Sequence, residues 1–157
     1  MGGELRRNGG GNKVDGRKTV SSEDLKQYFS KDLFAQHVGI ELVDAGDGRA
    51  RAKLSVADHH LNGVRGIHGG AIFTLADLAF AAAANSRGRV AVAISCSIQF
   101  INAAAGTVIY ADAREISRNK RLASYTVTVT DESGTIISLF QGMAYRKKDP
   151  LEHLGDA

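Results

Sequence analysis

The sequence from residue 69 to residue 84 is the feature that most limits how this chain folds. Its residues are apolar or small, apart from Thr74 and the single carboxylate of Asp77. A helix that is apolar on every side belongs in the interior of a fold, because none of its faces favours water. We therefore expect a buried central helix with the other elements wrapped around it.

Asp77 is the costly residue of this segment. An unpaired charge in a dry interior costs folding free energy on the order of several kcal/mol. A buried acid of this kind either is satisfied by neighbouring hydroxyl or backbone groups or performs chemistry. The motif that precedes it, described below, favours the chemical role.

The chain before the central helix is predicted to form one helix and one hairpin. Residues 21–24 carry a hydroxyl capping residue followed by acidic side chains, which is typical of a helix start. Apolar residues recur at helical spacing through Phe34, and Gly39 is expected to stop this single helix. Residues 40–43 and 50–56 then read as two strands joined by a turn-forming cluster of Asp and Gly.

The chain after the central helix, which is predicted to end near residues 85–88, reads as strands only. Four strands are expected, at residues 91–102, 107–116, 122–131 and 135–145. In the first of them the even-numbered residues from Val92 to Phe100 form an apolar face that should pack, and Ser95 and Ser97 alternate onto a more polar face. No strand–helix–strand rhythm is present, so we predict an α+β fold with a largely antiparallel sheet of six strands curved around the central helix.

The chain of 157 residues has the size of one domain. We expect that domain at residues 21–149, after a disordered or tag-like leader at residues 1–20 and before a polar tail at residues 150–157. The leader holds five basic and two acidic residues, which accounts for the whole net charge of +3. The rest of the chain is neutral, so the charge predicts no basic face for nucleic acid.

Cys96 is the only cysteine, which excludes an internal disulfide and fits a reducing compartment. Its apolar neighbours predict a small core residue. No run is apolar enough to span a membrane or to act as a signal peptide. We expect a cytoplasmic protein with neither a membrane nor a nucleic-acid partner.

Asp58, His59 and His60 have the residue types of a metal site. No second group of His or Cys at ligand spacing accompanies them. We therefore predict solvated loop residues here and no metal.

Gly69 and Gly70 lie where the central helix is predicted to begin. The first N–H groups of a helix have no partner within it, and the helix dipole makes this end positive. Glycine also lets a carbonyl oxygen approach the backbone closely, so this end is suited to hold the oxyanion that develops in acyl transfer.

Asp77 and Gly70 share one helix face but lie too far apart to act on one carbonyl. Seven residues separate them, which is roughly 10 Å along the axis and about 20° around it. Two such helices side by side and antiparallel would place Gly70 of one chain opposite Asp77 of the other. We therefore predict an active site shared across a two-fold homodimer.

These residues also resemble those of a known family. The resemblance is carried by Asn62-Gly63, His68-Gly69-Gly70, Phe73 to Asp77, Phe80, Asn85-Ser86 and residues 91–100. In this order and spacing they closely resemble hotdog-fold acyl-CoA thioesterases of the phenylacetate-degradation (PaaI) subfamily, over about residues 27–147. The resemblance implies a hotdog fold, a dimer with a continuous sheet that is often doubled to a homotetramer, and hydrolysis of coenzyme A thioesters. It also implies that no metal or redox cofactor is used and that coenzyme A enters only as part of the substrate.

The resemblance also implies roles for individual residues. Asp77 would be the general base or the nucleophile at the thioester carbonyl, and the Gly70 N–H would hold the oxyanion. Asn62 and His68 would orient the carbonyl or the water from the loop. For His68 the alternative is a local hydrogen bond that fixes the entry into the helix.

The substrate would also contact Gly69 and the turn between the strands at residues 107–116 and 122–131. An apolar slot for the acyl group is expected among the neighbours of Asp77, which are Phe73, Leu75 and Phe80. The candidates for binding the phosphate groups of coenzyme A are Arg118, Lys120 and Arg121. The alternative for these three is an ordinary solvated turn.

One position departs from the family pattern. Some related thioesterases carry at Ala93 a serine or threonine that assists the water, and alanine cannot do this. Ser95 and Ser97, predicted to lie on the same strand face, are the candidates to compensate.

The predicted function is hydrolysis of small acyl-CoA thioesters, with phenylacetyl or hydroxylated relatives favoured by the resemblance. One alternative is a hotdog hydratase or dehydratase, which would ordinarily need a His–acid pair at the α and β carbons of the substrate. Another is a non-enzymatic acyl-CoA-binding module, which would keep the pocket without needing Asp77. The sequence selects neither between nucleophile and base nor between dimer and tetramer.

Overall fold

The structure is a computed structural model that describes residues 13–14, 17–18 and 20–151. Most of the predicted leader and tail therefore lies outside the described residues. Within the leader, β1 (Lys13–Val14) and β2 (Arg17–Lys18) pair as short antiparallel strands. None of the helices in the described ranges combines the length and the apolar character that crossing a membrane requires.

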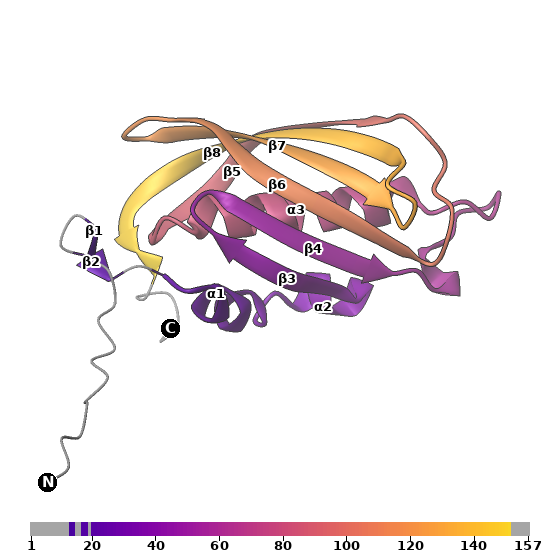
Figure 1. Ribbon diagram of the computed structural model, residues 1–157, viewed down its shortest axis with the longest axis horizontal. Coiled ribbons are helices and arrows are strands. Elements are labelled where there is room, and N and C mark those ends of the chain that lie inside the picture. Colours follow the sequence, from indigo (N-terminus) through magenta and orange to yellow (C-terminus); the bar gives the residue numbers. More distant parts are fainter. Residues whose placement is uncertain (1–12, 15–16, 19, 152–157) are drawn as a thin grey trace, which may run out of the picture.

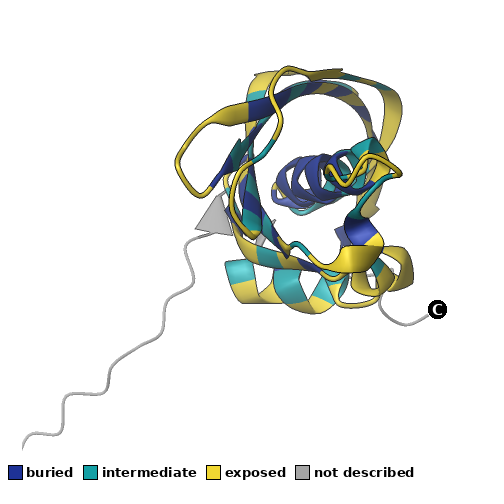
Figure 2. Ribbon diagram, turned by 90° about the vertical axis from the view of Figure 1, so that its right-hand side faces the viewer, coloured by how far each residue is buried: buried dark blue, intermediate teal, exposed yellow. Residues whose placement is uncertain are grey.

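A single antiparallel sheet of six strands, in the order β3-β4-β6-β7-β8-β5, forms the body of the fold. The strands are β3 (Ile40–Gly46), β4 (Arg49–Ser55), β5 (Arg89–Phe100), β6 (Val108–Arg118), β7 (Leu122–Asp131) and β8 (Ile136–Pro150). The sheet curves over the long helix α3 (Gly69–Asn85), and Figures 1 and 2 show α3 lying inside this curve. The predicted α+β class and the sheet wrapped around a central helix are confirmed.

The first hairpin forms where its turn residues predict it. Asp47 and Gly48 link β3 to β4 with φ angles of 50° and 75°, the left-handed pair that a tight two-residue hairpin turn needs. Beyond the turn, buried residues alternate with more exposed ones along β4, so Ala50, Ala52 and Leu54 face α3.

The predicted single N-terminal helix is wrong, because the chain forms two helices there. Helix α1 (Ser22–Phe29) starts at the predicted cap, where Ser21 and Asp24 bond to each other's backbone N–H. A second cap at Asp32, which accepts from the Ala35 N–H at 3.0 Å, starts α2 (Leu33–Val38) in a new direction. As a result Leu33 and Phe34, which the helical spacing placed on the buried face, are 76% and 64% exposed.

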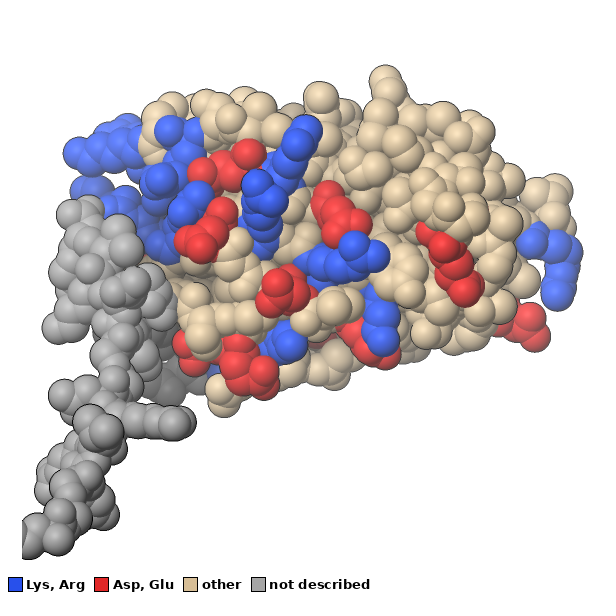
Figure 3. All heavy atoms as spheres, in the orientation of Figure 1, with Lys and Arg blue, Asp and Glu red and all other residues tan. Residues whose placement is uncertain are grey.

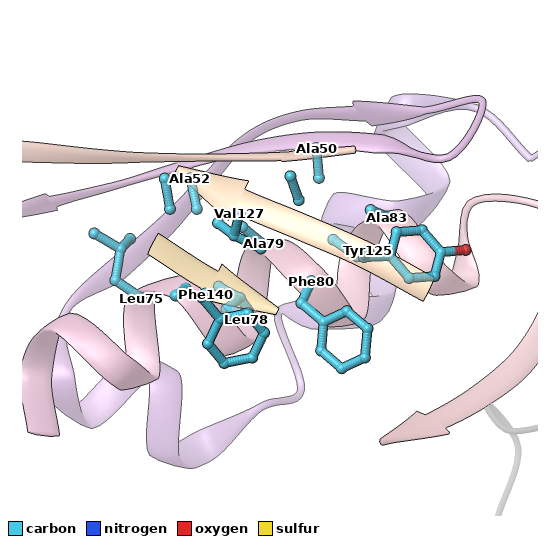
Figure 4. Close-up of a cluster of buried hydrophobic side chains, with 14 of the residues drawn as sticks. Ala50, Ala52, Leu75, Leu78, Ala79, Phe80, Ala83, Tyr125, Val127 and Phe140 are labelled. Atoms are coloured by element: carbon cyan, nitrogen blue, oxygen red, sulfur yellow. The ribbon is translucent and has the colours of Figure 1, made fainter. Parts of the chain in front are cut away.

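Helix α3 fits its enclosure because small side chains line both sides of the contact. Figure 4 shows alanines of α3 and β4 facing each other around larger rings. The Phe80 ring packs edge-on against Tyr125, with ring centroids 5.5 Å apart, and lies 5.7 Å from the centroid of Phe140. At the end of α3 the buried Asn85 side chain bonds to both the N–H and the C=O of Ala91, which fixes the start of β5.

Strand β8 continues five residues further than predicted, to Pro150. Arg89 at the start of β5 pairs with Pro150, and the Leu151 N–H donates to the Gly88 carbonyl at 3.3 Å. The buried Leu151 side chain closes this end of the core. The fold therefore extends slightly beyond the boundary expected at residue 149.

Strand β5 does not present the single packed face that its alternation predicts. The pairing with β8 shifts between Ala93 and Ser95, so Ala93 pairs with the buried Ala144 but Ser95 pairs with the exposed Met143. This bulge exchanges the two faces of β5 at Ile94. β5 is also an edge strand, so Val92, Ile94 and Phe100 remain 40%, 55% and 56% exposed.

We predict that Gly142→Ala in β8 lowers the free energy of unfolding by about 1–3 kcal/mol. A Cβ atom at Gly142 would lie 2.8 to 3.0 Å from three ring atoms of Phe80, which is held between Tyr125 and Phe140. Urea denaturation measures this change. Gly46→Ala in β3, where an added Cβ meets nothing within 4 Å, is the matched control and should stay near the wild-type value.

Candidate active site

The N-terminus of α3 is closed by His68. The His68 Nδ1 atom accepts a hydrogen bond from the Gly70 N–H at 2.8 Å, so a neutral ring carries its proton on Nε2. This local bond is the alternative that the sequence left open for His68. The Gly70 N–H can therefore reach a substrate oxygen only when the imidazole turns aside, whereas the described part of the chain offers the neighbouring Gly69 N–H no acceptor.

Both glycines at this end make room for rings. An added Cβ at Gly69 would lie 3.0 Å from the Phe100 ring, and one at Gly70 would lie 3.0 Å from His68 Nδ1. The exposed Phe100 ring of β5 thus lies directly against the first turn of α3. The helix start, the cap and the end of β5 form one compact corner.

Asp77 lies two turns further along α3 and is half-buried. Its carboxylate forms no hydrogen bond or ion pair with any described residue. Among these residues, therefore, no hydroxyl or backbone group satisfies the acid, which was the alternative to a chemical role. Burial raises the pKa of Asp77, and the negative charge of Asp32 at the start of α2 raises it further. A carboxylate in this state binds a proton more readily than an exposed one.

The neighbourhood of Asp77 combines segments that are far apart in the sequence. Cys96 faces α3 from β5, where it pairs with Gly142, and its thiol pKa is raised by burial and by the charge of Asp77. Asp32 approaches from α2. The Asp77 side chain therefore lies where α3 meets the edge strand β5 and the start of α2. No local sequence signal indicates that Cys96 and Asp32 come close to Asp77.

Asn62 organises the loop before α3. Its Oδ1 atom accepts from the N–H groups of Val64 and Gly66 at 3.1 and 3.0 Å, and its own N–H donates to the Gly66 carbonyl at 2.8 Å. Arg65, with a φ of 65°, completes this tight loop. The Oδ1 atom is thus committed to the loop, and the Nδ2 amide is the group of Asn62 left for the predicted role toward a substrate.

His60 is not the solvated loop residue that we expected. It is buried, its Nδ1 accepts from the Ala57 N–H at 2.9 Å, and its Nε2–H donates to the Val38 carbonyl. The ring therefore ties the loop to the end of α2. His59 and Asp58 are exposed as predicted, and among the described residues no group of His, Cys, Asp or Glu could hold a metal ion.

The apolar slot predicted beside Asp77 is only partly present. Phe73 is half-buried and packs edge-on against Phe140, with ring centroids 5.5 Å apart. Leu75 and Phe80 are at most 1% exposed and belong to the core instead. Leu75, two residues after Phe73, is rotated about 200° around the helix and faces the core. Phe80 shares the face of Phe73 two turns further along, but its ring is enclosed between Tyr125 and Phe140. Neither side chain can contact a ligand without opening the core.

The serines of β5 cannot stand in for Ala93, contrary to our expectation. Ala93 pairs with Ala144 on the face toward α3, but Ser95 and Ser97 pair with Met143 and Gln141 on the outer face. The bulge at Ile94 separates the two faces. Neither serine hydroxyl therefore points toward Asp77.

The basic turn lies at the opposite end of α3 from the glycines. The Arg118 Nε donates to Glu115 at 3.2 Å, and the same carboxylate accepts from Arg87, which follows α3. Asp77 lies eight residues before Asn85, about 12 Å along the axis from this end of the helix. A single chain therefore does not bring Arg118, Lys120 and Arg121 next to Asp77.

Strand pairing adds further cations to this turn and creates what we call the basic end. Arg146 pairs with Ala91, Arg89 pairs with Pro150, and the Arg146 guanidinium donates to the Asn119 carbonyl at 2.7 Å. The basic end comprises Arg87, Arg89, Arg118, Lys120, Arg121, Arg146, Lys147 and Lys148, with the acids Asp47, Glu115 and Asp149 among them. Figure 3 shows Lys and Arg gathered at one end of the face in view. Although the net charge of the chain after residue 20 is zero, its positive charges are therefore concentrated at one end of the molecule.

Known proteins resemble this chain in both sequence and structure. A family model described as the thioesterase superfamily matches residues 66–138. The acyl-coenzyme A thioesterase PaaI of Escherichia coli (strain K12) is 34% identical, over 79% of this chain and 89% of that protein. The solved structure of the E. coli PaaI protein superposes with a TM-score of 0.76 at 30% identity and covers 82% of this chain and 97% of that one. A mutant of the phenylacetic acid degradation protein PaaI from Thermus thermophilus superposes with a TM-score of 0.70 at 34% identity, covering 74% and 100%.

We predict that Asp77→Asn stabilises the protein at neutral pH. The folded state holds the Asp77 proton more tightly than the unfolded state, whose pKa is near 3.8, so ionisation of this group lowers the free energy of unfolding as pH rises through and above that value. Asparagine removes this loss. Urea denaturation should show a stability gain for the variant that grows between pH 4 and pH 7, and a gain that is independent of pH would contradict the assignment.

Proposed function

Because the chain belongs to the thioesterase superfamily and is an acyl-CoA thioester hydrolase, we propose that its substrates are small acyl-CoA thioesters, with phenylacetyl-type aromatic acyl groups favoured. The products are the free acid and coenzyme A. One observation carries the proposal: Asp77, a half-buried carboxylate without a hydrogen-bond or ion-pair partner among the described residues, lies on a helix that begins with two glycines. The PaaI relatives support the aromatic substrate class.

The active site is completed by a second copy of the chain. The outer edge of β5 has no neighbouring strand among the described residues, and the apolar residues Ile94 and Phe100 of this strand and Ile101 directly after it are 55%, 56% and 48% exposed. Such an edge is a template for pairing with another chain. Antiparallel pairing of β5 with β5 joins the two sheets and places two α3 helices side by side, with Gly70 of one chain near Asp77 of the other.

In this arrangement the thioester lies between the two helices. Its carbonyl oxygen accepts from the Gly69 N–H and, once the His68 imidazole turns aside, from the Gly70 N–H, where the positive helix end stabilises the oxyanion. Asp77 of the other chain removes a proton from a water whose oxygen attacks the carbonyl carbon, and its raised pKa makes it a stronger base than an exposed carboxylate. Collapse of the tetrahedral intermediate breaks the C–S bond, and the coenzyme A thiolate leaves and takes up a proton. Direct attack by Asp77, through a mixed anhydride that water then cleaves, is the second route.

Other parts of the molecule bind the remainder of the substrate. The half-buried Phe73 contacts the acyl group, and the Asn62 amide orients the carbonyl or the water. The basic end, which includes Arg118, Lys120 and Arg121, binds the phosphate groups of coenzyme A. These phosphates lie a pantetheine arm away from the thioester, so their site does not have to adjoin Asp77.

The assembly and its location complete the proposal. Two dimers associate into a homotetramer in the cytoplasm. The outer face of the sheet offers Ile116, Met143 and Tyr145, which are 56%, 37% and 40% exposed, as a surface for this association.

The two alternatives fit the site less well. A hydratase or dehydratase needs a His–acid pair, but His68 caps Gly70 and the buried His60 is bonded through both ring nitrogens. A binding module without catalysis gives no reason for the folding cost of Asp77. Hydrolysis accounts for both the acid and the helix end.

We predict that Asp77→Asn lowers kcat by at least about a hundredfold, the scale of a lost general base. Steady-state kinetics on a panel of aromatic and aliphatic acyl-CoA thioesters measures this and identifies the preferred acyl group. Circular dichroism provides the control for folding. Unchanged turnover in the folded variant would defeat the assignment, and equal rates across the panel would defeat the aromatic preference.

A mixing experiment tests the shared site. Asp77→Asn and Gly70→Val each disable both sites of their own homodimer, the second because a larger side chain at residue 70 meets the His68 ring. Co-refolding equal amounts should restore about a quarter of wild-type activity, since half of the dimers then hold one site with both native residues. If the mixture stays as inactive as its components, Asp77 and Gly70 act within the same chain.

A further inference from the structure

The basic end contains a carboxylate that the proposed mechanism does not use. Glu115 of β6 has a side chain only 15% exposed, and it accepts three hydrogen bonds. Its Oε1 atom receives Arg87 Nη2 at 3.3 Å and Arg118 Nε at 3.2 Å, and its Oε2 atom receives the Tyr125 hydroxyl at 3.1 Å. Burial raises the pKa of Glu115, but the Tyr125 hydroxyl and the two guanidinium groups outweigh burial and lower it, so the carboxylate is charged at neutral pH.

Glu115 binds Arg118 through one guanidinium nitrogen and leaves the other N–H groups of Arg118 free to donate. Only the Nε edge of the guanidinium is used, and the two terminal nitrogens of Arg118 have no partner among the described residues. A planar guanidinium binds an oxyanion best through two parallel N–H groups. Fixing Nε therefore orients the remaining donors without occupying them.

The backbone beneath Arg118 is fixed as well. Asn119 Oδ1 accepts from the N–H groups of Arg121 and Leu122 at 2.9 and 2.8 Å, and the buried Arg146 guanidinium donates to the Asn119 carbonyl. Burial lowers the pKa of Arg146, and the nearby charges of Arg118 and Arg89 lower it further. Like charges are thus gathered on a rigid turn, an arrangement that costs stability and is relieved by a bound anion.

We propose that Glu115 is a positioning residue, which holds the Arg118 guanidinium in place to contact a phosphate group of coenzyme A. This inference rests on the proposed function, in which the basic end binds those phosphates. Glu115 does not touch the substrate. It restricts the Arg118 side chain before the ligand binds, so that binding costs less conformational entropy.

A purely electrostatic role of Glu115 makes the opposite prediction. Removing a negative charge from the basic end raises its positive potential and should tighten phosphate binding. Loss of positioning weakens binding, because Arg118 must then be ordered by the ligand. The direction of the change in KM therefore separates the two roles.

The test compares Glu115→Gln with the wild-type protein on one acyl group carried by coenzyme A and by N-acetylcysteamine, which lacks the phosphates. We expect KM for the acyl-CoA to rise about three- to tenfold with kcat unchanged, and the kinetics of the N-acetylcysteamine thioester to stay the same. Arg118→Ala should raise the same KM at least as much. The double variant should be no worse than Arg118→Ala alone, because Glu115 acts through Arg118.

Two matched variants exclude simpler explanations. Asp149→Asn removes an exposed negative charge from the same end without a contact to Arg118, so it should lower KM for the acyl-CoA by the electrostatic effect alone. Tyr125→Phe removes one hydrogen bond to Glu115 from inside the core, so it should lower Tm without changing the ratio of the two KM values.

The outcomes distinguish the inference from its premise. A lower or unchanged KM in Glu115→Gln, or effects of Glu115→Gln and Arg118→Ala that add in the double variant, would overturn the positioning role. A wild-type protein that hydrolyses neither thioester would instead overturn the proposed function. If Arg118→Ala alone leaves KM unchanged, the phosphates bind elsewhere and the inference fails with them.

Discussion

The enclosure of α3 by the curved sheet is the constraint on which the other features depend. A helix without a polar face is stable only when every side is covered, and the alanines of α3 and the facing strands let the sheet approach closely enough to do this. The ring stack of Phe80, Tyr125 and Phe140 fills the wider part of the space. Because no residue in the described part of the chain pairs with Asp77, nothing there offsets the folding cost of this carboxylate.

The two ends of α3 are chemically different, and this difference organises the proposed site. The N-terminal end offers the backbone N–H of Gly69 and, beneath the His68 cap, that of Gly70, beside the Phe100 ring. The C-terminal end lies among cations that strand pairing brings together around Glu115. An acyl-CoA thioester has a carbonyl at one end of a long arm and phosphates at the other, which matches this separation of amide groups from guanidinium groups.

Local sequence signals located most of the helices and strands. They failed where a single residue could interrupt a regular pattern without a sign of this in the pattern itself. The all-apolar run located α3, and Asp47-Gly48 located the hairpin turn, because each signal concerns residues close together in the chain. The helical spacing through Phe34 did not show that a second cap at Asp32 interrupts the helix. The alternation along β5 was disturbed by the bulge at Ile94, which changed the face of every residue on one side of it.

The sequence by itself determined the buried helix, the glycines at its start and the acid within it, because helix formation and capping depend on residues a few positions apart. Only the tertiary structure decided which side chains surround that acid and which surround the basic turn. Cys96 reaches Asp77 through the pairing of β5 with β8, and Glu115, Tyr125 and Arg146 meet through the registers of three strands. A register is fixed by the whole sheet closing around the helix, so no short segment of sequence can specify it alone.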